Sequence, residues 1–416
     1  MTHNMKRTTI ITVAACAAAC TGNWTDNAIE TASWQLQAAA ERFADTDTIP
    51  RSTYTWNSLE FIESQVEMKQ SEFYDVFEPQ PSEGKLGKVL PCSSIYDWTS
   101  GFFPGSLWYA YEISGKESLK EMATAFTKRL EPVRKLKDTH DIGFMMQCSY
   151  GNALRLAPAD SVKAILIETA DNLIARFDPR IGCIRSWDFG EWNYPVIIDN
   201  MMNLDLLFNV SRLTGDSRYR DVAVQHAMTT MKNHFRPDYT TWHVVSYNDD
   251  GSVEMKVTHQ GKNHDSSWSR GQGWAIYGYS MCYRETGDSI FLDHAVKVAD
   301  MIMKHNTAPK LIPYWDFEAP AKPETPRDAS AAAIIASAML ELSTYAPDGQ
   351  KYFGYAETIL RNLSGPGYLA AKGTNNGFVL MHSTGSLPHN SEIDTPINYA
   401  DYYYLEALKR YLDIRK

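Results

Sequence analysis

The chain has 416 residues, of which 44% are hydrophobic and 22% are charged, and its formal net charge is −10. These values are ordinary for a globular enzyme, and the length allows two average domains or one large fold with a single core. A net charge this negative gives no general attraction for nucleic acid or long polyanions, so we expect no nucleic-acid partner. An acidic ligand would have to be recognised by a few local Arg or Lys side chains.

The N-terminus has the pattern of an export signal. Two basic residues precede an apolar run at residues 9–19, which is too short to span a bilayer permanently. Cys20 follows three alanines, as the acylated cysteine of a bacterial lipoprotein does, although the usual leucine three places earlier is missing. Cys16 is an alternative processing site. We therefore expect residues 1–20 to form an export and lipoprotein signal, and the protein to be periplasmic or membrane-anchored through lipidated Cys20 in a Gram-negative bacterium.

Apolar residues recur at helical spacing through most of the remaining chain. Helices are predicted over residues 31–46, 101–114, 116–132, 145–156, 160–176, 196–214, 217–235, 270–286, 288–306, 328–345, 350–363 and 398–412, with another short helix near 56–69. Two breaks share the pattern Thr-Gly-Asp-Ser, after Leu213 and Glu285, in which Gly ends one helix and Asp or Ser caps the next. About twelve helices in repeated helix–turn–helix units predict an all-α (α/α)6 barrel that forms a single domain over residues 21–416.

Two segments depart from the helical pattern. Residues 240–258 alternate β-branched residues around Asp249-Asp-Gly251, which is a β-hairpin signal. Residues 373–397 are rich in Gly, Ser, Pro and Asn. We expect both segments at the rim of the barrel, with the hairpin forming a small excursion at the mouth of a central cavity.

An aspartate interrupts the apolar pattern of residues 194–209. A buried carboxylate such as that of Asp199 costs free energy unless it is paired, hydrogen-bonded or protonated. A lone aspartate near a helix start has an ordinary explanation, because the helix dipole favours negative charge there. A second isolated acid, Asp141 in the segment His140-Asp-Ile-Gly-Phe, favours a functional pair of carboxylates.

Tryptophans recur in short polar motifs. The motifs are Asp97-Trp98-Thr-Ser-Gly, Ser186-Trp187-Asp-Phe-Gly-Glu-Trp192 and Ser267-Trp268-Ser-Arg-Gly-Gln-Gly-Trp274. An indole face flanked by hydrogen-bonding groups suits a pyranose ring, whose C–H face stacks while its hydroxyls need partners. Any one of these tryptophans also fits a core anchor. Three clusters together with two isolated acids predict a carbohydrate site.

These motifs resemble those of a known family. His140-Asp-Ile-Gly-Phe, Ile197-Ile-Asp-Asn-Met-Met-Asn-Leu and Trp268-Ser-Arg-Gly-Gln-Gly-Trp are similar to the unsaturated glucuronyl hydrolases, glycoside hydrolase family 88, as are the segments beginning at Arg327 and Tyr399. The resemblance implies an (α/α)6 barrel and an exo-acting glycoside hydrolase. It also implies the substrate, a lyase-generated glycosaminoglycan-type oligosaccharide that loses its 4,5-unsaturated glucuronyl residue from the non-reducing end.

The resemblance further implies hydration of the C4=C5 vinyl ether and not displacement at the anomeric carbon. Asp199 matches the general acid that protonates C4, and Asp141 matches its companion carboxylate. We assign Arg270 to the uronate carboxylate by charge complementarity. The positions that match sugar-contacting residues are Trp98, His140, Trp187, His243, Gln260, Trp268 and Trp274.

One loop departs from the family in a way that bears on the substrate. Members that act on sulfated chondroitin fragments resemble one another in a Ser-x-x-Ser-x-Lys loop. Ser383 and Ser386 match its serines and are predicted to bind substrate, but Pro388 stands where the lysine would be. Some of those members also have an arginine where Gln260 stands. The sulfation pattern that this chain accepts stays open at this point.

Two other functions also stay open. One is an unsaturated rhamnogalacturonyl hydrolase that acts on pectin fragments, and the other is a non-catalytic, lipid-anchored glycan-binding protein. The His140 and Trp268 motifs favour the glucuronyl hydrolase, and a non-catalytic protein gives no reason for two isolated acids. No CxxC, HExxH or calcium-loop spacing appears, so we predict neither a metal nor a cofactor. Cys148 and Cys282 are predicted to be free buried thiols.

Overall fold

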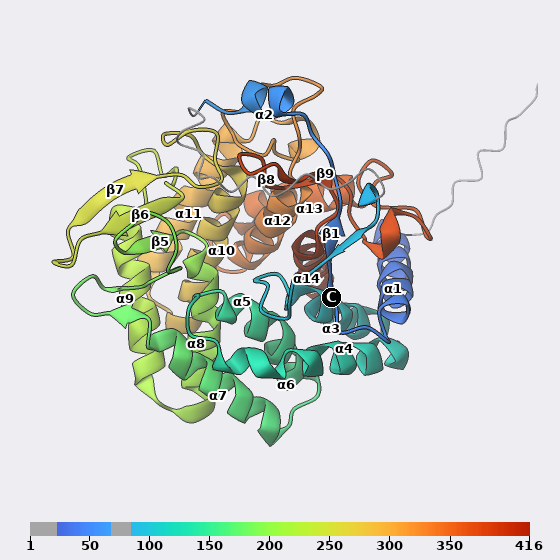
Figure 1. The fold of residues 1–416 in the computed structure, drawn as a ribbon, viewed down its shortest axis with the longest axis horizontal. Helices are drawn as coiled ribbons and strands as arrows, with labels where there is room; N and C mark the ends of the chain where they lie inside the picture. Colours follow the sequence, from blue (N-terminus) through green and yellow to red (C-terminus); the bar gives the residue numbers. More distant parts are fainter. Residues whose placement is uncertain (1–22, 68–84) are drawn as a thin grey trace, which may run out of the picture.

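The computed structural model describes residues 23–67 and 85–416, and its helices form two concentric rings (Figure 1). The inner ring contains α3 (Phe102–Ser114), α5 (Ile142–Met146) with α6 (Asn152–Leu156), α8 (Asn200–Thr214), α10 (Ser269–Thr286), α12 (Ala329–Ser343) and α14 (Asn398–Arg415). The outer ring contains α1 (Trp24–Arg42), α4 (Glu117–Arg129), α7 (Asp160–Ile174), α9 (Ser217–Asn233), α11 (Ser289–His305) and α13 (Gly349–Leu363). Each inner helix contacts the next, and α14 packs against α3. This closure confirms the predicted (α/α)6 barrel.

The largest differences from the predicted helices concern three of them. The first helix begins at Trp24, seven residues before the predicted start, with Asn23 as its cap. The helix predicted over residues 145–156 is divided by a π-helical turn, Gln147–Gly151. The helix predicted over residues 196–214 begins only at Asn200, because the residues before it form a strand. The short α2 (Leu59–Gln65) lies within the predicted range 56–69. The predicted export signal lies outside the described residues.

The structure also contains short antiparallel strands. The strands are β1 (Pro50–Thr53), β2 (Val89–Pro91), β3 (Phe177–Asp178), β4 (Cys183–Ile184), β5 (Pro195–Ile197), β6 (Val244–Tyr247), β7 (Val253–Val257), β8 (Ser383–Ser386) and β9 (Ser391–Thr395). The predicted hairpin is confirmed as β6–β7, and β5 adds a third strand through the pairing of Val196 with Val245. The segment predicted as a loop at 373–397 contains the hairpin β8–β9.

Inner helices approach one another closely at glycines. A Cβ added at Gly143 of α5 would lie 2.4 Å from Asn203 Oδ1, and one added at Gly278 of α10 would lie 2.5 Å from Met201 Cβ. Both contacts are shorter than real side chains allow, so the spacing of α5, α8 and α10 requires glycine at these positions. The hydrogen bond from Phe144 N to Asn203 Oδ1, 2.7 Å, further fixes α5 against α8. This close packing matters because α5 and α8 begin next to the predicted catalytic acids.

Aromatic side chains fill the middle of the barrel and separate its two ends. Phe144 packs against Trp98 at 5.8 Å and against Trp274 at 5.2 Å between ring centroids, and Tyr403 packs against Trp274 at 5.4 Å. Phe144 lines a cavity of about 330 Å³ among the C-terminal halves of the inner helices. Trp98 lines a different cavity at the opposite end.

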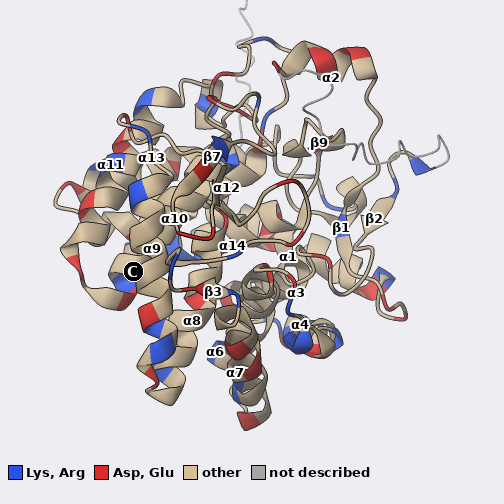
Figure 2. Ribbon diagram, turned by 60° about the vertical axis from the view of Figure 1, so that its left-hand side comes forward, with Lys and Arg blue, Asp and Glu red and all other residues tan. Residues whose placement is uncertain are grey.

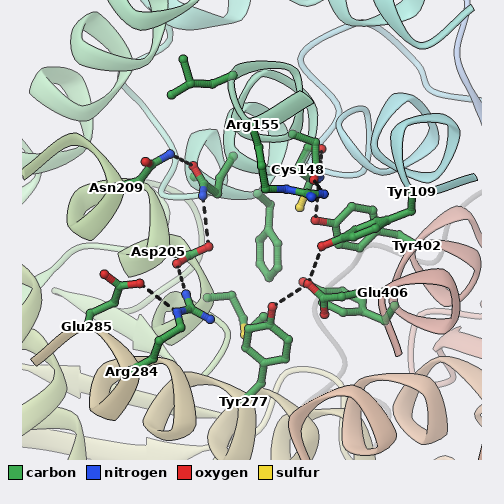
Figure 3. Close-up of a pocket in the computed structure, with 18 of the residues that line it drawn as sticks. Tyr109, Cys148, Arg155, Asp205, Asn209, Tyr277, Arg284, Glu285, Tyr402 and Glu406 are labelled. Carbon is green, nitrogen blue, oxygen red and sulfur yellow. Dashed lines mark hydrogen bonds and ion pairs between the residues drawn. The ribbon is translucent and has the colours of Figure 1, made fainter. Parts of the chain in front are cut away.

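The cavity at the C-terminal ends holds a network of paired charges (Figure 3). Arg284 donates to Asp205 and Glu341, at 2.5 and 2.8 Å. Glu406 accepts hydrogen bonds from Tyr109 and Tyr277, each at 2.9 Å. These bonds connect α3, α8, α10, α12 and α14, so the network stabilises the closed ring. Because its charges are satisfied within the protein, this cavity is a poor candidate for the catalytic site.

Charged residues occur on the outer helices, such as α4 and α7 (Figure 2). The four cysteines of the described chain, Cys92, Cys148, Cys183 and Cys282, are buried and unpaired, which confirms the prediction for Cys148 and Cys282.

Within residues 23–67 and 85–416, no helix combines the length and the apolarity that crossing a bilayer requires.

Candidate active site

The N-terminal ends of the inner helices gather at one end of the barrel. Asp141, Asp199, Trp268 and Asp328 are the residues immediately before α5, α8, α10 and α12. Outer helices return the chain to this end, so the loops that carry the predicted motifs all open here. Helix N-termini present unsatisfied N–H groups and partial positive charge, so this end favours an anionic ligand despite the negative net charge of the protein.

A cavity of about 460 Å³ opens among these loops. It is lined by Tyr96, Trp98, Leu136, Asp138, Thr139, Asp141, Met145, Trp187, Phe189, Ile197, Asp199, His259 and Gln260. The two predicted catalytic carboxylates, Asp141 and Asp199, therefore face the same space, although 57 intervening residues separate them in the sequence. We call this space the catalytic cavity.

Asp199 is held at the point where β5 ends and α8 begins. Its side chain is only 8% exposed, and its Oδ2 atom makes no hydrogen bond. Burial raises the pKa of Asp199 to about 7, against the opposing effects of the Arg270 charge and the Trp274 side chain, and the nearby Asp141 raises the pKa further. A carboxyl group with this pKa is partly protonated near neutral pH, as a general acid must be.

Asp141 lines the same cavity from the start of α5. Burial raises its pKa to about 7, while a hydrogen bond from the Thr139 hydroxyl, 2.9 Å from Oδ2, opposes that rise. His140 Nε2 lies 3.3 Å from Asp141 Oδ1. Burial lowers the pKa of His140 to about 3, so the imidazole is neutral and this contact is not an ion pair.

The two carboxyl groups differ in their access to water. The side chain of Asp141 is 20% exposed and that of Asp199 is 8% exposed. Hydration favours the ionised form, so Asp141 loses its proton first as the pH rises. The resulting charge disfavours ionisation of Asp199. Near neutral pH the pair therefore contains one ionised companion, Asp141, and one protonated acid, Asp199.

His243 is fixed in one tautomer beside Asp199. Its Nδ1 atom accepts hydrogen bonds from the backbone N–H groups of His259 and Gln260, both at 3.1 Å. Burial lowers the pKa of His243 well below its usual range, so the ring is neutral. Its single proton must then lie on Nε2, 3.6 Å from Asp199 Oδ2. This proton points at the oxygen that lacks a partner.

Unpaired polar atoms mark the catalytic end of the barrel. Most buried polar groups in proteins are hydrogen-bonded, so a cluster without partners needs an explanation. Side-chain atoms without a hydrogen bond here include Trp187 Nε1, Asp199 Oδ2, His243 Nε2, Trp274 Nε1 and Ser383 Oγ. A bound ligand rich in hydroxyl groups would satisfy such a cluster. At the other end of the barrel, the charged side chains of the paired network already have partners within the protein.

Aromatic rings form the walls of the catalytic cavity. Trp187 stacks on Phe189 with ring centroids 4.8 Å apart and an angle of 14°. Phe189 is 58% exposed and Tyr96 is 46% exposed, so both rings lie at the mouth. Trp98 also lines the cavity and packs against Tyr399 with ring centroids 5.2 Å apart. Flat apolar walls beside buried acids suit a sugar ring.

The comparison with known families agrees with this geometry. Residues 70–410 match the model of Glycosyl Hydrolase Family 88. The chain belongs to that family.

Individual members of family 88 are similar over most of their length. An unsaturated glucuronyl hydrolase from Formosa agariphila is 48% identical over 319 residues, which cover 76% of this chain and 80% of that protein. An unsaturated glucuronyl hydrolase from Bacillus sp. is 34% identical over 347 residues, which cover 80% of this chain and 90% of that protein. A solved structure described as an unsaturated glucuronyl hydrolase specific for heparin is 46% identical, with a TM-score of 0.85, and covers 94% of this chain and 98% of its own.

Arg270 has a different place from the one predicted for it. Its Nη1 donates to Asp328 Oδ2 at 2.8 Å and to the Thr384 carbonyl at 2.6 Å, and its Nη2 donates to the Gly385 carbonyl at 2.5 Å. The side chain is 1% exposed and is not among the residues that line the catalytic cavity. The assignment to the uronate carboxylate is therefore replaced by a structural one. Arg270 ties α10 to α12 and β8, and its charge lowers the pKa of Asp199.

The other predicted site residues lie at different places around the catalytic cavity. Trp98, Trp187 and Gln260 line the catalytic cavity directly. His140, His243, Trp268 and Trp274 lie behind it, where Trp268 packs on the His243 ring at 4.5 Å. Ser386 lines a smaller adjoining cavity, whereas Ser383 is fully buried in β8.

Several lining residues were not predicted from the sequence. They are Tyr96, Leu136, Asp138, Thr139, Met145, Phe189, Ile197 and His259. Phe189 lies inside the motif that begins at Ser186, and His259 precedes Gln260, so proximity to a motif was the available signal. Within the described residues, no group of three or more His, Cys, Asp or Glu side chains is arranged to hold a metal ion. The prediction of a metal-free reaction stays a prediction.

Proposed function

We propose that the protein removes the 4,5-unsaturated glucuronyl residue from the non-reducing end of glycosaminoglycan-type oligosaccharides by hydrating its C4=C5 bond. Membership of family 88 supports this activity. The observation that carries the mechanism is the pair of buried carboxyl groups, Asp141 and Asp199, facing one aromatic-walled cavity with pKa values of about 7.

The reaction begins with proton transfer from Asp199. Its carboxyl group protonates C4 of the vinyl ether, and positive charge develops at C5 and the ring oxygen. Ionised Asp141 stabilises that charge, because opposite charges attract strongly in a cavity with little water. The His243 Nε2–H, 3.6 Å from Asp199 Oδ2, is placed to donate to the carboxylate that the proton transfer creates.

Water completes the reaction at C5. The Asp199 carboxylate accepts a proton from a water molecule as its oxygen bonds to C5, which regenerates the acid and forms a hemiketal. The hemiketal opens by breaking the bond between C5 and the ring oxygen, and C1 becomes a hemiacetal. Collapse of this hemiacetal breaks the bond to the next sugar and releases the shortened glycan. Atoms balance with the consumption of one water molecule.

The uronate carboxylate is held by neutral donors and helix ends. The described residues that line the catalytic cavity include no Lys or Arg, and burial lowers the pKa of His259 to about 3, so this ring is neutral. The partial positive charges at the N-termini of α5 and α8 remain as the local attraction. We therefore expect modest affinity for the carboxylate, with orientation set by stacking on Trp187 and Trp98.

Heparin-type disaccharides are our first candidate substrates. A structure that is 46% identical and covers nearly all of this chain is described as specific for heparin. The lysine that marks members acting on sulfated chondroitin fragments is replaced by Pro388. A rhamnogalacturonyl hydrolase and a non-catalytic binding protein are both less consistent with the glucuronyl hydrolases found among the relatives.

The test is a spectroscopic assay with lyase-generated disaccharides. Hydration of C4=C5 destroys the conjugated ultraviolet chromophore of the unsaturated uronate, whereas ordinary glycoside cleavage preserves it. We expect absorbance to fall with heparin-type disaccharides and more slowly, or not at all, with unsaturated rhamnogalacturonan fragments. Glycan release without loss of absorbance would contradict the hydration mechanism, and absence of turnover on every uronate would contradict the activity.

We also propose export and lipidation of the protein. The basic start, the apolar run over residues 9–19 and Cys20 after three alanines support this proposal. Labelled palmitate should be incorporated by the full-length protein and lost in Cys20→Ala. Labelling that persists in Cys20→Ala and disappears in Cys16→Ala would place the site at Cys16 instead.

A further inference from the structure

The chain between β7 and α10 forms a turn next to His243. His259 and Gln260 lie at the start of this turn, and their backbone N–H groups are the two donors that hold His243 Nδ1. This arrangement leaves the proton of His243 Nε2 3.6 Å from Asp199 Oδ2. The position of the turn therefore determines where that proton points. We call residues 258–266 the rim turn.

A buried carboxylate holds the rim turn in place. Asp316 belongs to the segment between α11 and α12 and is fully buried. Its Oδ2 accepts hydrogen bonds from the backbone N–H of Lys262, at 2.9 Å, and from the Ser266 hydroxyl, at 2.7 Å. Its Oδ1 accepts the backbone N–H of Glu318 at 3.0 Å. One side chain thus ties two positions of the rim turn to a segment that lies 54 and 50 residues later.

The packing of the rim turn leaves little room for another arrangement. A Cβ added at Gly261 would lie 2.7 Å from Thr258 Oγ1 and 3.3 Å from Asp316 Oδ2. The Gly261 N–H donates to Thr258 Oγ1 at 2.8 Å. Turn and carboxylate therefore pack as one unit, and a change at Asp316 is transmitted to the N–H groups at the start of the turn.

The other supports of the rim turn are exposed or more distant. Lys262 Nζ pairs with Glu67, whose side chain is 60% exposed, and surface ion pairs contribute little because water screens them. Arg236 donates to two carbonyl groups near the end of the turn, at 3.1 and 3.3 Å. Asp316 bonds the turn two residues from Gln260, so it is the buried support beside the donors that hold the imidazole.

From these contacts we propose that Asp316 is a positioning residue for the proton transfer and acts through the rim turn on His243. The inference rests on the proposed function, in which the His243 Nε2–H donates to the Asp199 carboxylate. If the turn shifts, the imidazole loses the two N–H donors that fix its tautomer, and Nε2 no longer presents a proton. Ionised Asp199 then lacks its donor, so transfer of its proton to C4 becomes less favourable.

A double-mutant cycle tests this role. Asp316→Ala should lower kcat by about tenfold in the wild-type background and by less than about twofold in His243→Ala, where the path to Asp199 is already broken. Loss of ultraviolet absorbance at saturating disaccharide measures kcat for the wild type, both single variants and the double variant. An aspartate that serves only the fold would lower kcat by the same factor in both backgrounds.

Asp316→Asn is the conservative variant. The asparagine Oδ1 can accept hydrogen bonds from the Lys262 N–H and the Ser266 hydroxyl, so the rim turn keeps its position. We expect kcat of this variant to stay within about threefold of the wild type, although the charge has been removed. A kcat as low as that of Asp316→Ala would contradict a role that depends on holding the turn.

Asp401→Ala is the matched control. Asp401 is 1% exposed and accepts the backbone N–H groups of Val379 and Leu380, at 2.9 and 2.8 Å. The substitution removes the same atoms from a similarly buried place, whose donors lie outside the rim turn. Tm should fall in both alanine variants, but kcat of Asp401→Ala should change by less than about twofold and show no coupling to His243→Ala.

Ser266→Ala replaces Asp316→Ala in the cycle if the latter fails to fold. It removes the hydroxyl that donates to Asp316 Oδ2 and leaves the buried carboxylate in place. Because one of the two bonds to the turn remains, we expect a smaller coupling to His243→Ala, of about threefold in kcat.

The outcomes separate this inference from the proposed function. A wild type that consumes no unsaturated disaccharide overturns the proposed function itself. With an active wild type, equal effects of Asp316→Ala in the two backgrounds overturn only the positioning role. A coupling of the same size for Asp401→Ala would also overturn it, because the effect would then follow from any buried aspartate.

Discussion

At the residue scale, the position of Asp199 explains how a common side chain becomes an acid that works near neutral pH. Its carboxyl group lies at the start of α8, is nearly buried and shares its cavity with a second carboxyl group, that of Asp141. We expect Asp199→Asn to keep the fold and to lower kcat by about 10²–10⁴ or more, which is typical for loss of a general acid. Loss of ultraviolet absorbance with saturating disaccharide measures the effect. Turnover close to the wild-type rate would exclude Asp199 as the proton donor.

The raised pKa of Asp199 also predicts how stability changes with pH. The fold favours the protonated form, so its contribution to stability is complete below about pH 4 and is lost as the pH rises to about 7. Asparagine cannot ionise and does not suffer this loss. At pH 8 we therefore expect the free energy of unfolding of Asp199→Asn to exceed that of the wild type by about 2–4 kcal/mol, with little difference at pH 4. Urea titrations at both pH values test this, and an equal difference at the two would contradict it.

The Arg270 guanidinium group stabilises the fold next to the catalytic site. A lysine keeps the charge but cannot reach Asp328 and two carbonyl groups together. We expect Arg270→Lys to lower the free energy of unfolding by about 3 kcal/mol while KM changes by less than about threefold. Urea unfolding and steady-state kinetics measure the two effects. A tenfold rise in KM with unchanged stability would restore the assignment to the uronate carboxylate.

At the element scale, the approach of α5 to α8 sets the distance between the two catalytic acids. Each helix begins directly after its aspartate, and Gly143 lies against Asn203 where the helices touch. Gly143→Ala forces the helices apart, so we expect a loss of stability of about 1–3 kcal/mol and a fall in kcat. Gly354→Ala on the outer helix α13 is the control, because a Cβ there meets no atom within 4 Å. The control should be neutral or slightly stabilising in thermal unfolding. Equal behaviour of the two variants would show that this spacing does not matter.

Strand β5 illustrates how an element can override its local pattern. Residues 195–197 continue the apolar spacing of the following helix, but they pair with β6, whose residues lie about fifty positions later. This pairing ends at Ile197, and α8 starts three residues afterwards. The junction directs the Asp199 side chain into the catalytic cavity, instead of placing it within a continuous helix.

At the scale of the whole molecule, the barrel divides its polar interior into two ends with different chemistry. The end at the helix C-termini contains charges that satisfy one another, and the catalytic end contains Asp199 Oδ2 and indole N–H groups without hydrogen-bond partners. The aromatic layer around Phe144 keeps the two apart.

The reaction proposed for this molecule uses only protein carboxyl groups and water. We therefore expect dialysis against EDTA to leave kcat and KM unchanged within about 20%, since proton transfer needs no Lewis acid here. The disaccharide assay before and after chelation measures this. Activity that disappears with EDTA and returns with a divalent cation would require a metal in the mechanism.

The sequence by itself determined the features that depend on neighbouring residues. Apolar spacing located the helices, the Thr-Gly-Asp-Ser breaks located their ends, and Asp249-Asp-Gly251 located the hairpin turn. Two isolated acids among tryptophan motifs were enough to identify Asp141 and Asp199 as the candidate pair, and the motif resemblance gave the family. Each of these signals is short-range, because helix periodicity, capping and turn formation act within a few residues.

Only the tertiary structure decided the partners of these residues. Arg270 looked like a ligand for a carboxylate, but Asp328 and β8, both far along the chain, occupy its guanidinium group. Arg51 and Glu392 form an ion pair although most of the sequence separates them, and no local pattern predicts that contact. Charge, burial and pKa depend on what closes around a side chain. That surrounding shell is assembled from distant segments, so it exists only once the ring of helices has closed.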